Sequence, residues 1–145
     1  MKAEELMIGD YVQLNGSPYV IEEISKKGWV HMTDPVHNLR VQMSTDYILD
    51  FIEGIPLTEE ILKANGWRAG NNKAWLLLRL GCDEVNIMLG KNYAEIEYLN
   101  MCFNPEDPAE VNYGANFEFP RKVCVHELQH ILRMYDVEKD LKLEP

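Results

Sequence analysis

Alternating apolar and polar positions mark the first third of the chain as rich in strands. The Asn15-Gly16 dipeptide supplies the positive φ angles of a tight hairpin turn, and Lys26-Lys27-Gly28 is a second turn signal. Short strands separated by turn signals about every 8–12 residues are typical of small sandwiches and barrels. We therefore expect residues 1–55 to form a small twisted β-barrel. Its predicted strands are Tyr11–Leu14, Tyr19–Ile24, Trp29–Met32, Val41–Met43 and Ile48–Ile52.

A helix and three strands are expected next. Thr58 is a predicted N-cap, acidic residues follow it in the first turn, and Asn65-Gly66 ends the helix. A period of two then returns, most clearly where apolar residues alternate with Glu95 and Glu97, which predicts one buried face and one wet face. The predicted strands are Ala74–Leu80, Val85–Leu89 and Tyr93–Leu99.

The end of the chain is predicted to hold a long loop and one more helix. Periodicity disappears between 100 and 120, so we expect about twenty residues of loop, longer than most connections. A helix from about Arg121 to Tyr135 follows. The elements predict an α+β fold, in which the barrel at 1–55 precedes a 56–145 unit. That unit comprises a helix, a three-stranded antiparallel sheet and a C-terminal helix packed on one sheet face, and the two units either stand apart or share one core.

Composition excludes several classes of function. The chain has 14 Lys and Arg against 24 Asp and Glu, a net charge of −10, and 46% of its residues are hydrophobic, as in an ordinary globular domain. Such a charge repels nucleic acid unless a basic stripe is set apart, and no such stripe is visible in the sequence. The acidic start and the lack of an apolar run of about 18 residues predict a cytoplasmic protein with no membrane partner.

Three cysteines stand in the sequence, at Cys82, Cys102 and Cys124. Their number and spacing fit neither a disulfide framework nor a Cys-x-x-Cys metal knuckle. We expect them to be reduced and mostly buried.

One motif points to a specific chemistry. His126-Glu127-Leu128-Gln129-His130 is a literal His-Glu-x-x-His pattern within the predicted last helix. At this spacing, His126 and His130 share a helix face and suit two bonds to zinc, while Glu127 suits the general base for a zinc-bound water. The motif predicts a minimal zinc-dependent hydrolase of the metallopeptidase kind, with zinc as its cofactor.

Two features of the sequence weaken that prediction. A catalytic zinc needs a third protein ligand, and the short tail after the motif offers Asp136, Glu138 and Glu144, of which Asp136 and Glu138 are the candidates. At about 100° per residue, the apolar stripe of the helix lies opposite the two histidines, so we expect His126 and His130 to point toward solvent or a partner rather than into a walled cleft.

A family resemblance weakens it further. The segments Met1–Val12, Gly54–Leu62 and Val125–His130 resemble a family of small uncharacterised proteins of anaerobic gut bacteria, often found near phage-like or mobile elements. Some members of that family have a tail that reads His-Gln-Leu-Gln-Asn, with Gln in place of Glu127 and Asn in place of His130. The resemblance implies that zinc chemistry is not the family's activity, and it transfers no catalytic or binding residue.

The sequence thus favours a non-enzymatic binding or accessory protein of a phage or mobile element, with a protein or peptide partner and no cofactor. The expected binding surface is the barrel or the face of the last helix that carries His126 and His130. A homo-oligomer is also compatible with the sequence. Tyr11, Tyr19 and Trp29 are candidates for an aromatic groove on the barrel. The zinc hydrolase is the alternative, and an acidic inhibitor that mimics nucleic acid is a third reading, based on net charge alone.

Overall fold

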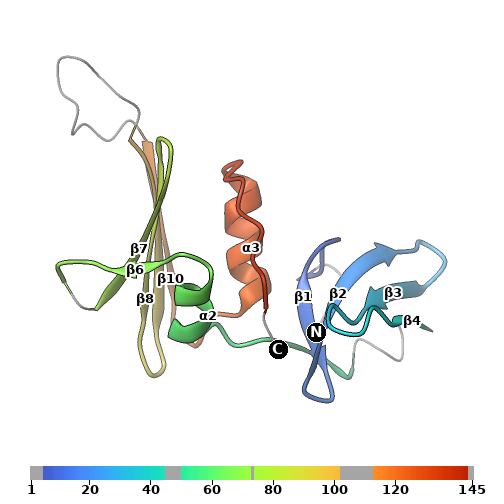
Figure 1. Ribbon diagram of the computed structural model, residues 1–145. Helices are drawn as coiled ribbons and strands as arrows, with labels where there is room; N and C mark the ends of the chain where they lie inside the picture. The colour runs from blue at the N-terminus through green and yellow to red at the C-terminus, as the bar shows by residue number, and fades with distance from the viewer. Residues whose placement is uncertain (1–4, 45–49, 73, 102–112, 144–145) are drawn as a thin grey trace. The chain divides into compact units, whose positions relative to one another are not determined.

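The computed structural model describes residues 5–44, 50–72, 74–101 and 113–143. The chain divides into two compact units, each built on an antiparallel sheet (Figure 1). Unit 1 comprises residues 1–56, 124–135 and 143–145, and unit 2 comprises residues 57–123 and 136–142. The described residues are mostly β, with two helices, which agrees with an α+β class.

Unit 1 contains an open sheet with the strand order β4-β3-β2-β1-β5. Asn15 and Gly16, with φ angles of 52° and 79°, form the predicted hairpin turn between β1 and β2. The prediction of a closed β-barrel is wrong, because β4 and β5 are opposite edges of this sheet, and closure requires the edge strands to pair. The strands are β1 (Tyr11–Leu14), β2 (Ser17–Ile24), β3 (Trp29–Thr33), β4 (Arg40–Ser44) and β5 (Ile52–Gly54).

One face of this sheet carries the apolar core of unit 1. Val12, Ile21 and Met32 have no exposed surface, as their alternation with polar neighbours predicts. The same alternation separates Tyr11 from Tyr19, because Tyr11 pairs with Val20 while Tyr19 pairs with Val12 on the core face. The predicted aromatic groove is therefore wrong, since its members do not share a face. The buried core residues are Leu6, Val12, Ile21, Val30, Met32 and Ile52.

Unit 2 contains a five-stranded sheet with the order β10-β9-β8-β7-β6, rather than the predicted three strands. β10 lies within the stretch predicted to be loop, of which residues 102–112 fall outside the described residues. Alternation of Ala115, Phe117 and Phe119 with polar residues gives β10 its strand character, and it pairs with β9 along its whole length. The strands are β6 (Arg68–Ala69), β7 (Trp75–Leu80), β8 (Asp83–Leu89), β9 (Ala94–Asn100) and β10 (Tyr113–Phe119).

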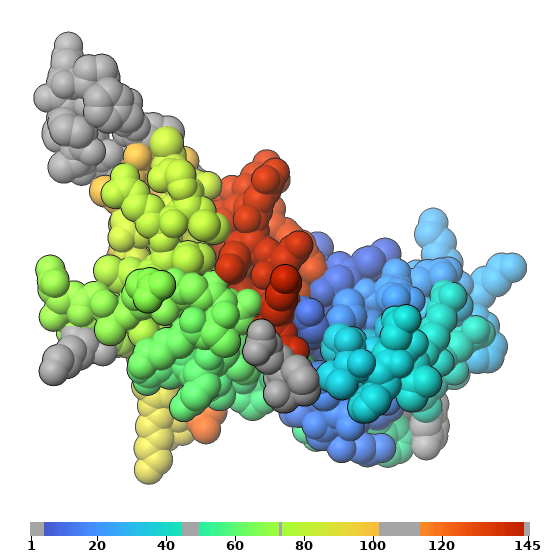
Figure 2. Space-filling view, in the orientation of Figure 1, coloured from blue at the N-terminus to red at the C-terminus, as the bar shows by residue number. Residues whose placement is uncertain are grey.

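The two helices begin where the chain supplies caps. The hydroxyl of Thr58 accepts a hydrogen bond from the Ile61 N–H at 3.2 Å and starts α2 (Glu59–Ala64), which ends at Asn65 as predicted. α2 lies at the surface of unit 2 (green in Figure 2). None of the described helices is long and apolar enough to cross a membrane.

α3 (Val125–Met134) starts later than predicted and groups with unit 1, whereas the sequence interpretation placed it in the 56–145 unit. Cys124 forms an isolated antiparallel bridge with Pro56, and the Val125 N–H donates to the Ile55 carbonyl at 2.8 Å. This pairing holds the backbone extended up to Cys124, so the helix cannot begin earlier. Cys82 is exposed and Cys124 half-buried, so the expectation of buried cysteines is wrong for Cys82, and Cys102 lies outside the described residues.

Candidate functional site

The two histidines of the His-Glu-x-x-His motif lie side by side on α3, as their spacing predicts. The centroids of the His126 and His130 rings are 5.7 Å apart, and the rings meet edge to face. The side of the helix that carries them is not open to solvent: His126 is 7% exposed and His130 is half-buried. The expectation that both imidazoles point outward is therefore wrong, because this face packs against the segment that leads into β1.

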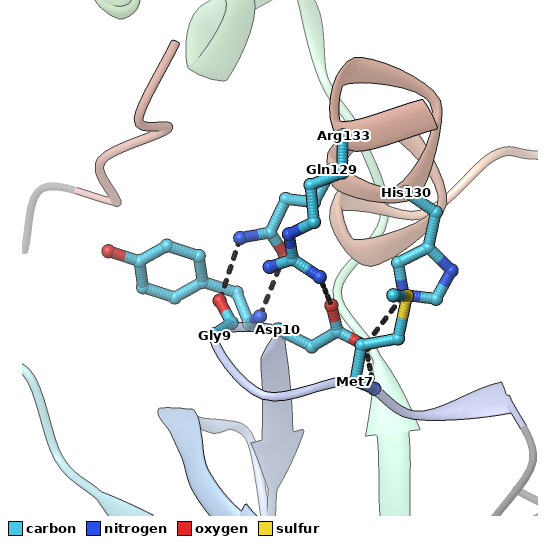
Figure 3. A network of polar contacts seen from close by, with 7 residues as sticks. Met7, Gly9, Asp10, Gln129, His130 and Arg133 are labelled. Atoms are coloured by element: carbon cyan, nitrogen blue, oxygen red, sulfur yellow. Dashed lines mark hydrogen bonds and ion pairs between the residues drawn. The ribbon is translucent and has the colours of Figure 1, made fainter. Parts of the chain in front are cut away.

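A buried carboxylate explains why that face packs inward (Figure 3). Asp10 has no exposed surface. Its Oδ2 accepts from the Met7 N–H at 2.7 Å and lies 2.7 Å from Nε2 of His130, while its Oδ1 accepts from Nη1 of Arg133 at 2.9 Å. A buried charge is tolerated only when it is paired and hydrogen-bonded, and Arg133 supplies the compensating charge.

This arrangement fixes the hydrogen on one ring nitrogen of His130. A carboxylate oxygen only accepts hydrogen bonds, so Nε2 of His130 carries the hydrogen that faces Asp10. Nε2 therefore has no lone pair to offer to a metal ion while the contact with Asp10 is made.

Gln129 ties the same face of the helix to the backbone of unit 1. Its Oε1 accepts from the Tyr11 N–H at 2.9 Å, and its Nε2 donates to the Gly9 carbonyl at 2.9 Å (Figure 3). Gly9 has a φ of 92°, and a Cβ at this position would lie 2.8 Å from Nη2 of Arg133. The φ of 92° favours glycine, because an L side chain is strained in this backbone conformation, and the approach of the Arg133 side chain adds to that preference.

Glu127, the candidate general base, closes the start of its own helix. Its Oε1 accepts from the backbone N–H of Cys124 at 3.0 Å, which is the acidic half of a capping box. The carboxylate thus satisfies one of the N–H groups at the start of the helix and lies in the favourable field of the helix N-terminus.

His126 is held as a neutral ring. Burial lowers its pKa below the ordinary 6.5, and nearby acidic groups, Asp10 first among them, only partly oppose this shift. Its Nδ1 is buried and has no hydrogen-bond partner among the described residues. The ring is tightly packed, since a Cβ added at Gly54 would lie 3.0 Å from its Cε1.

The third-ligand candidates do not complete a metal centre within the described residues. No group of three or more His, Cys, Asp or Glu side chains there is arranged to hold a metal ion. Asp136 and Glu138 belong to unit 2, and Glu144 lies outside the described residues. Asp136 has a φ of 52° directly after the helix, so its backbone turns the chain away from a helical path.

Sequence reasoning missed a pocket of about 380 Å³ on the sheet of unit 2. This volume falls in the range of about 300–1,000 Å³ typical of small-molecule sites. Strand register places Leu77, Asn86 and Glu97 in one cross-strand row, on the face opposite the buried Ile87 and Ile96. The residues that line the pocket are Gly70, Asn71, Asn72, Trp75, Leu77, Asn86 and Glu97.

Asn86 is the unusual residue of this pocket. It is 7% exposed, its Nδ2 donates to Oε1 of Glu97 at 3.1 Å, and its Oδ1 is buried without a hydrogen-bond partner among the described residues. Because the carboxylate of Glu97 only accepts, the amide orientation is fixed with its oxygen on the unpaired side. A buried acceptor without a partner costs about 1–3 kcal/mol, so it calls for an explanation.

One sequence signal points to this pocket. Asn86 interrupts a run of apolar residues in β8, where a polar residue is expected only on a wet face, and Glu97 marks the wet face of β9. The signal for the partly buried Trp75 is weaker, because aromatic residues in strands are normally core residues.

No protein-family model matches this sequence, and neither a curated protein nor a solved structure matches it.

Proposed function

We propose that this chain is a non-enzymatic binding protein whose partner is a protein or peptide. The observation that carries the proposal is the use of the motif residues within the fold: His130 contacts Asp10, and Glu127 caps α3. The pocket on the sheet of unit 2 supports it further, because this pocket combines an aromatic ring with a carboxylate.

An accessory role in a phage or mobile element is the biological setting we propose. It rests on the resemblance of Met1–Val12, Gly54–Leu62 and Val125–His130 to the family described above. Such a role needs a partner rather than a reaction, which agrees with the binding function.

The zinc hydrolase is the alternative, and the geometry disfavours it on two grounds. A general base must face the water that it activates, whereas Glu127 bonds to the backbone of Cys124. A zinc ligand must offer a nitrogen lone pair, and the contact with Asp10 takes Nε2 of His130 out of use, which leaves only Nδ1 of that ring for a metal ion.

The test is the zinc content of the untagged full chain, purified without chelator, together with peptidase activity on denatured casein with added zinc. We expect far less than one zinc per chain and no cleavage. About one zinc per chain, lost in both His126→Ala and His130→Gln, with cleavage lost in Glu127→Gln, would establish the hydrolase and overturn the proposal. Circular dichroism of each variant separates loss of zinc from loss of fold.

A further inference from the structure

The carboxylate of Glu97 gives the unit 2 pocket an acceptor for a hydrogen-bond donor of a ligand. Of the residues that line it, only Glu97 carries a charge. One oxygen of Glu97 accepts from Asn86, and none of the ion pairs among the described residues involves this carboxylate. The second oxygen of Glu97 is an acceptor that lacks a donor there, whereas Oδ1 of Asn86 is buried out of reach of a ligand.

The neighbouring carboxylate on the same strand differs in this respect. Glu95 accepts from Asn116 at 2.7 Å with one oxygen and from the Tyr93 hydroxyl at 3.1 Å with the other. Glu97 is therefore the carboxylate of β9 that retains capacity for a ligand.

Trp75 adds a flat aromatic wall. It is partly buried and lines the pocket, and the register places it in a cross-strand row with Met88, Glu95 and Glu118. The pocket thus combines a tryptophan ring with a carboxylate, on a sheet face where further carboxylates raise the local negative potential. A planar cation suits these three features, because it stacks on the ring and donates to the carboxylate in its own plane.

We propose that this pocket binds the guanidinium group of an arginine side chain, presented by the protein or peptide partner; this inference rests on the proposed binding function. The guanidinium lies against the Trp75 ring and donates to the carboxylate of Glu97. The net charge of −10 favours the approach of such a basic partner.

The test is an NMR titration of the ¹⁵N-labelled full chain with the blocked tripeptide acetyl-Gly-Arg-Gly-amide. The matched ligand is the same tripeptide with citrulline, which keeps the shape of arginine but has no charge. We expect the arginine peptide to bind about tenfold more tightly, with shifts of the Trp75 indole and Asn86 amide signals, and its binding to weaken as salt rises.

Two variants of equal charge change locate the effect. Glu97→Gln is expected to abolish the preference for arginine over citrulline. Glu118→Gln, which removes a carboxylate of the same sheet face outside the pocket, is expected to retain it. Unchanged amide spectra away from the substitution verify that each variant is folded.

Three outcomes of the peptide titrations would overturn the inference. They are equal binding of the arginine and citrulline peptides, equal binding of the matching lysine peptide, and a preference for arginine that survives in Glu97→Gln. Binding of methyl β-glucoside at the pocket without binding of the arginine peptide would also overturn it, and would assign the pocket to a sugar. These results leave the proposed binding function standing, whereas stoichiometric zinc with peptidase activity would defeat that function whatever the pocket binds.

Discussion

The carboxylate of Asp10 lies 2.7 Å from Nε2 of His130, although 120 positions of sequence separate the two residues. One end of this contact precedes the first strand, and the other end stands on the last helix. The residue that the motif marks as a zinc ligand therefore serves as a hydrogen-bond donor inside unit 1. Arg133, one turn further along the helix, balances the charge of the same carboxylate.

Removal of the Asp10 charge should destabilise the protein. Asp10→Asn removes the charge that balances Arg133. Its amide nitrogen also replaces either Oδ1, which accepts from Arg133, or Oδ2, which accepts from both Met7 and His130. We expect the free energy of unfolding to fall by about 2–3 kcal/mol, below the usual cost of breaking a buried pair because Arg133 is 35% exposed. Urea denaturation measures the change, and Asp50→Asn at an exposed position is the control. Equal stability of the two variants would mean that the Asp10 network contributes nothing.

The substitution Gln129→Glu is expected to destabilise the protein. Gln129→Glu keeps the acceptor for the Tyr11 N–H but loses the donor to the Gly9 carbonyl, and it adds negative charge near Asp10. Loss of this partly buried hydrogen bond predicts a fall of about 0.5–1.5 kcal/mol in the free energy of unfolding. Gln42→Glu, on an exposed part of β4, should change stability by less than about 0.5 kcal/mol. Thermal denaturation of both variants tests the prediction. Equal melting temperatures of the two variants would contradict it.

Glu127 should behave as a helix cap. Glu127→Ala removes the acceptor for the Cys124 N–H and should cost roughly 0.5–2 kcal/mol, as other cap losses do. Glu127→Gln retains an oxygen at the same position and should cost less. A catalytic base would show the opposite pattern, with activity abolished by Gln and stability unaffected by either change. Denaturation curves of the two variants distinguish the roles.

His126 should make stability depend on pH. Burial lowers its pKa below 6.5, so the unfolded chain binds the proton more readily than the folded chain. The contribution of His126 to the free energy of unfolding is constant above pH 6.5. Below that value the free energy of unfolding falls as pH drops, by at most about 1.4 kcal/mol per pH unit.

The matched variants for this effect are His126→Phe and His37→Gln. The first removes the buried imidazole and should flatten the slope just below pH 6.5, while the second removes an imidazole that is 70% exposed and should preserve it. Denaturant titrations at several pH values give both slopes. The same slope in the wild-type chain and in His126→Phe would rule out the buried ring as its source.

Local signals were sufficient to predict much of the fold. Asn15-Gly16 marked its hairpin turn, and Thr58 and Asn65 marked the ends of α2. The alternation in β9 predicted the buried face that carries Ile96. Each of these signals acts over a few residues, so the local sequence is enough to predict the turn, the helix ends and the buried strand face.

Long-range pairing was the part that the sequence did not disclose. Whether β5 pairs with β4 or remains an edge of an open sheet depends on the twist and curvature of the whole sheet, which no short motif encodes. The sequence predicts loop where β10 lies, because periodicity disappears between 100 and 120 and Gly114 favours a turn, and pairing with β9 overrides that local preference.

The candidate site could be predicted only in part, because its contacts join residues that are far apart in the sequence. Helical spacing correctly placed His126 and His130 on one face, but their environment depends on Asp10, which the sequence offers as an ordinary turn residue. The pairing of Asn86 with Glu97 likewise depends on the register between β8 and β9.

The most direct test of the central claim, that the motif serves the fold rather than a metal ion, is the free energy of unfolding of the full chain in zinc and in chelator. A site that binds zinc in the folded state adds about 4 kcal/mol when zinc is at 1,000 times its dissociation constant. We predict the same denaturation midpoint in both solutions. A midpoint that rises with zinc, and does not rise in His126→Ala or His130→Gln, would contradict this account.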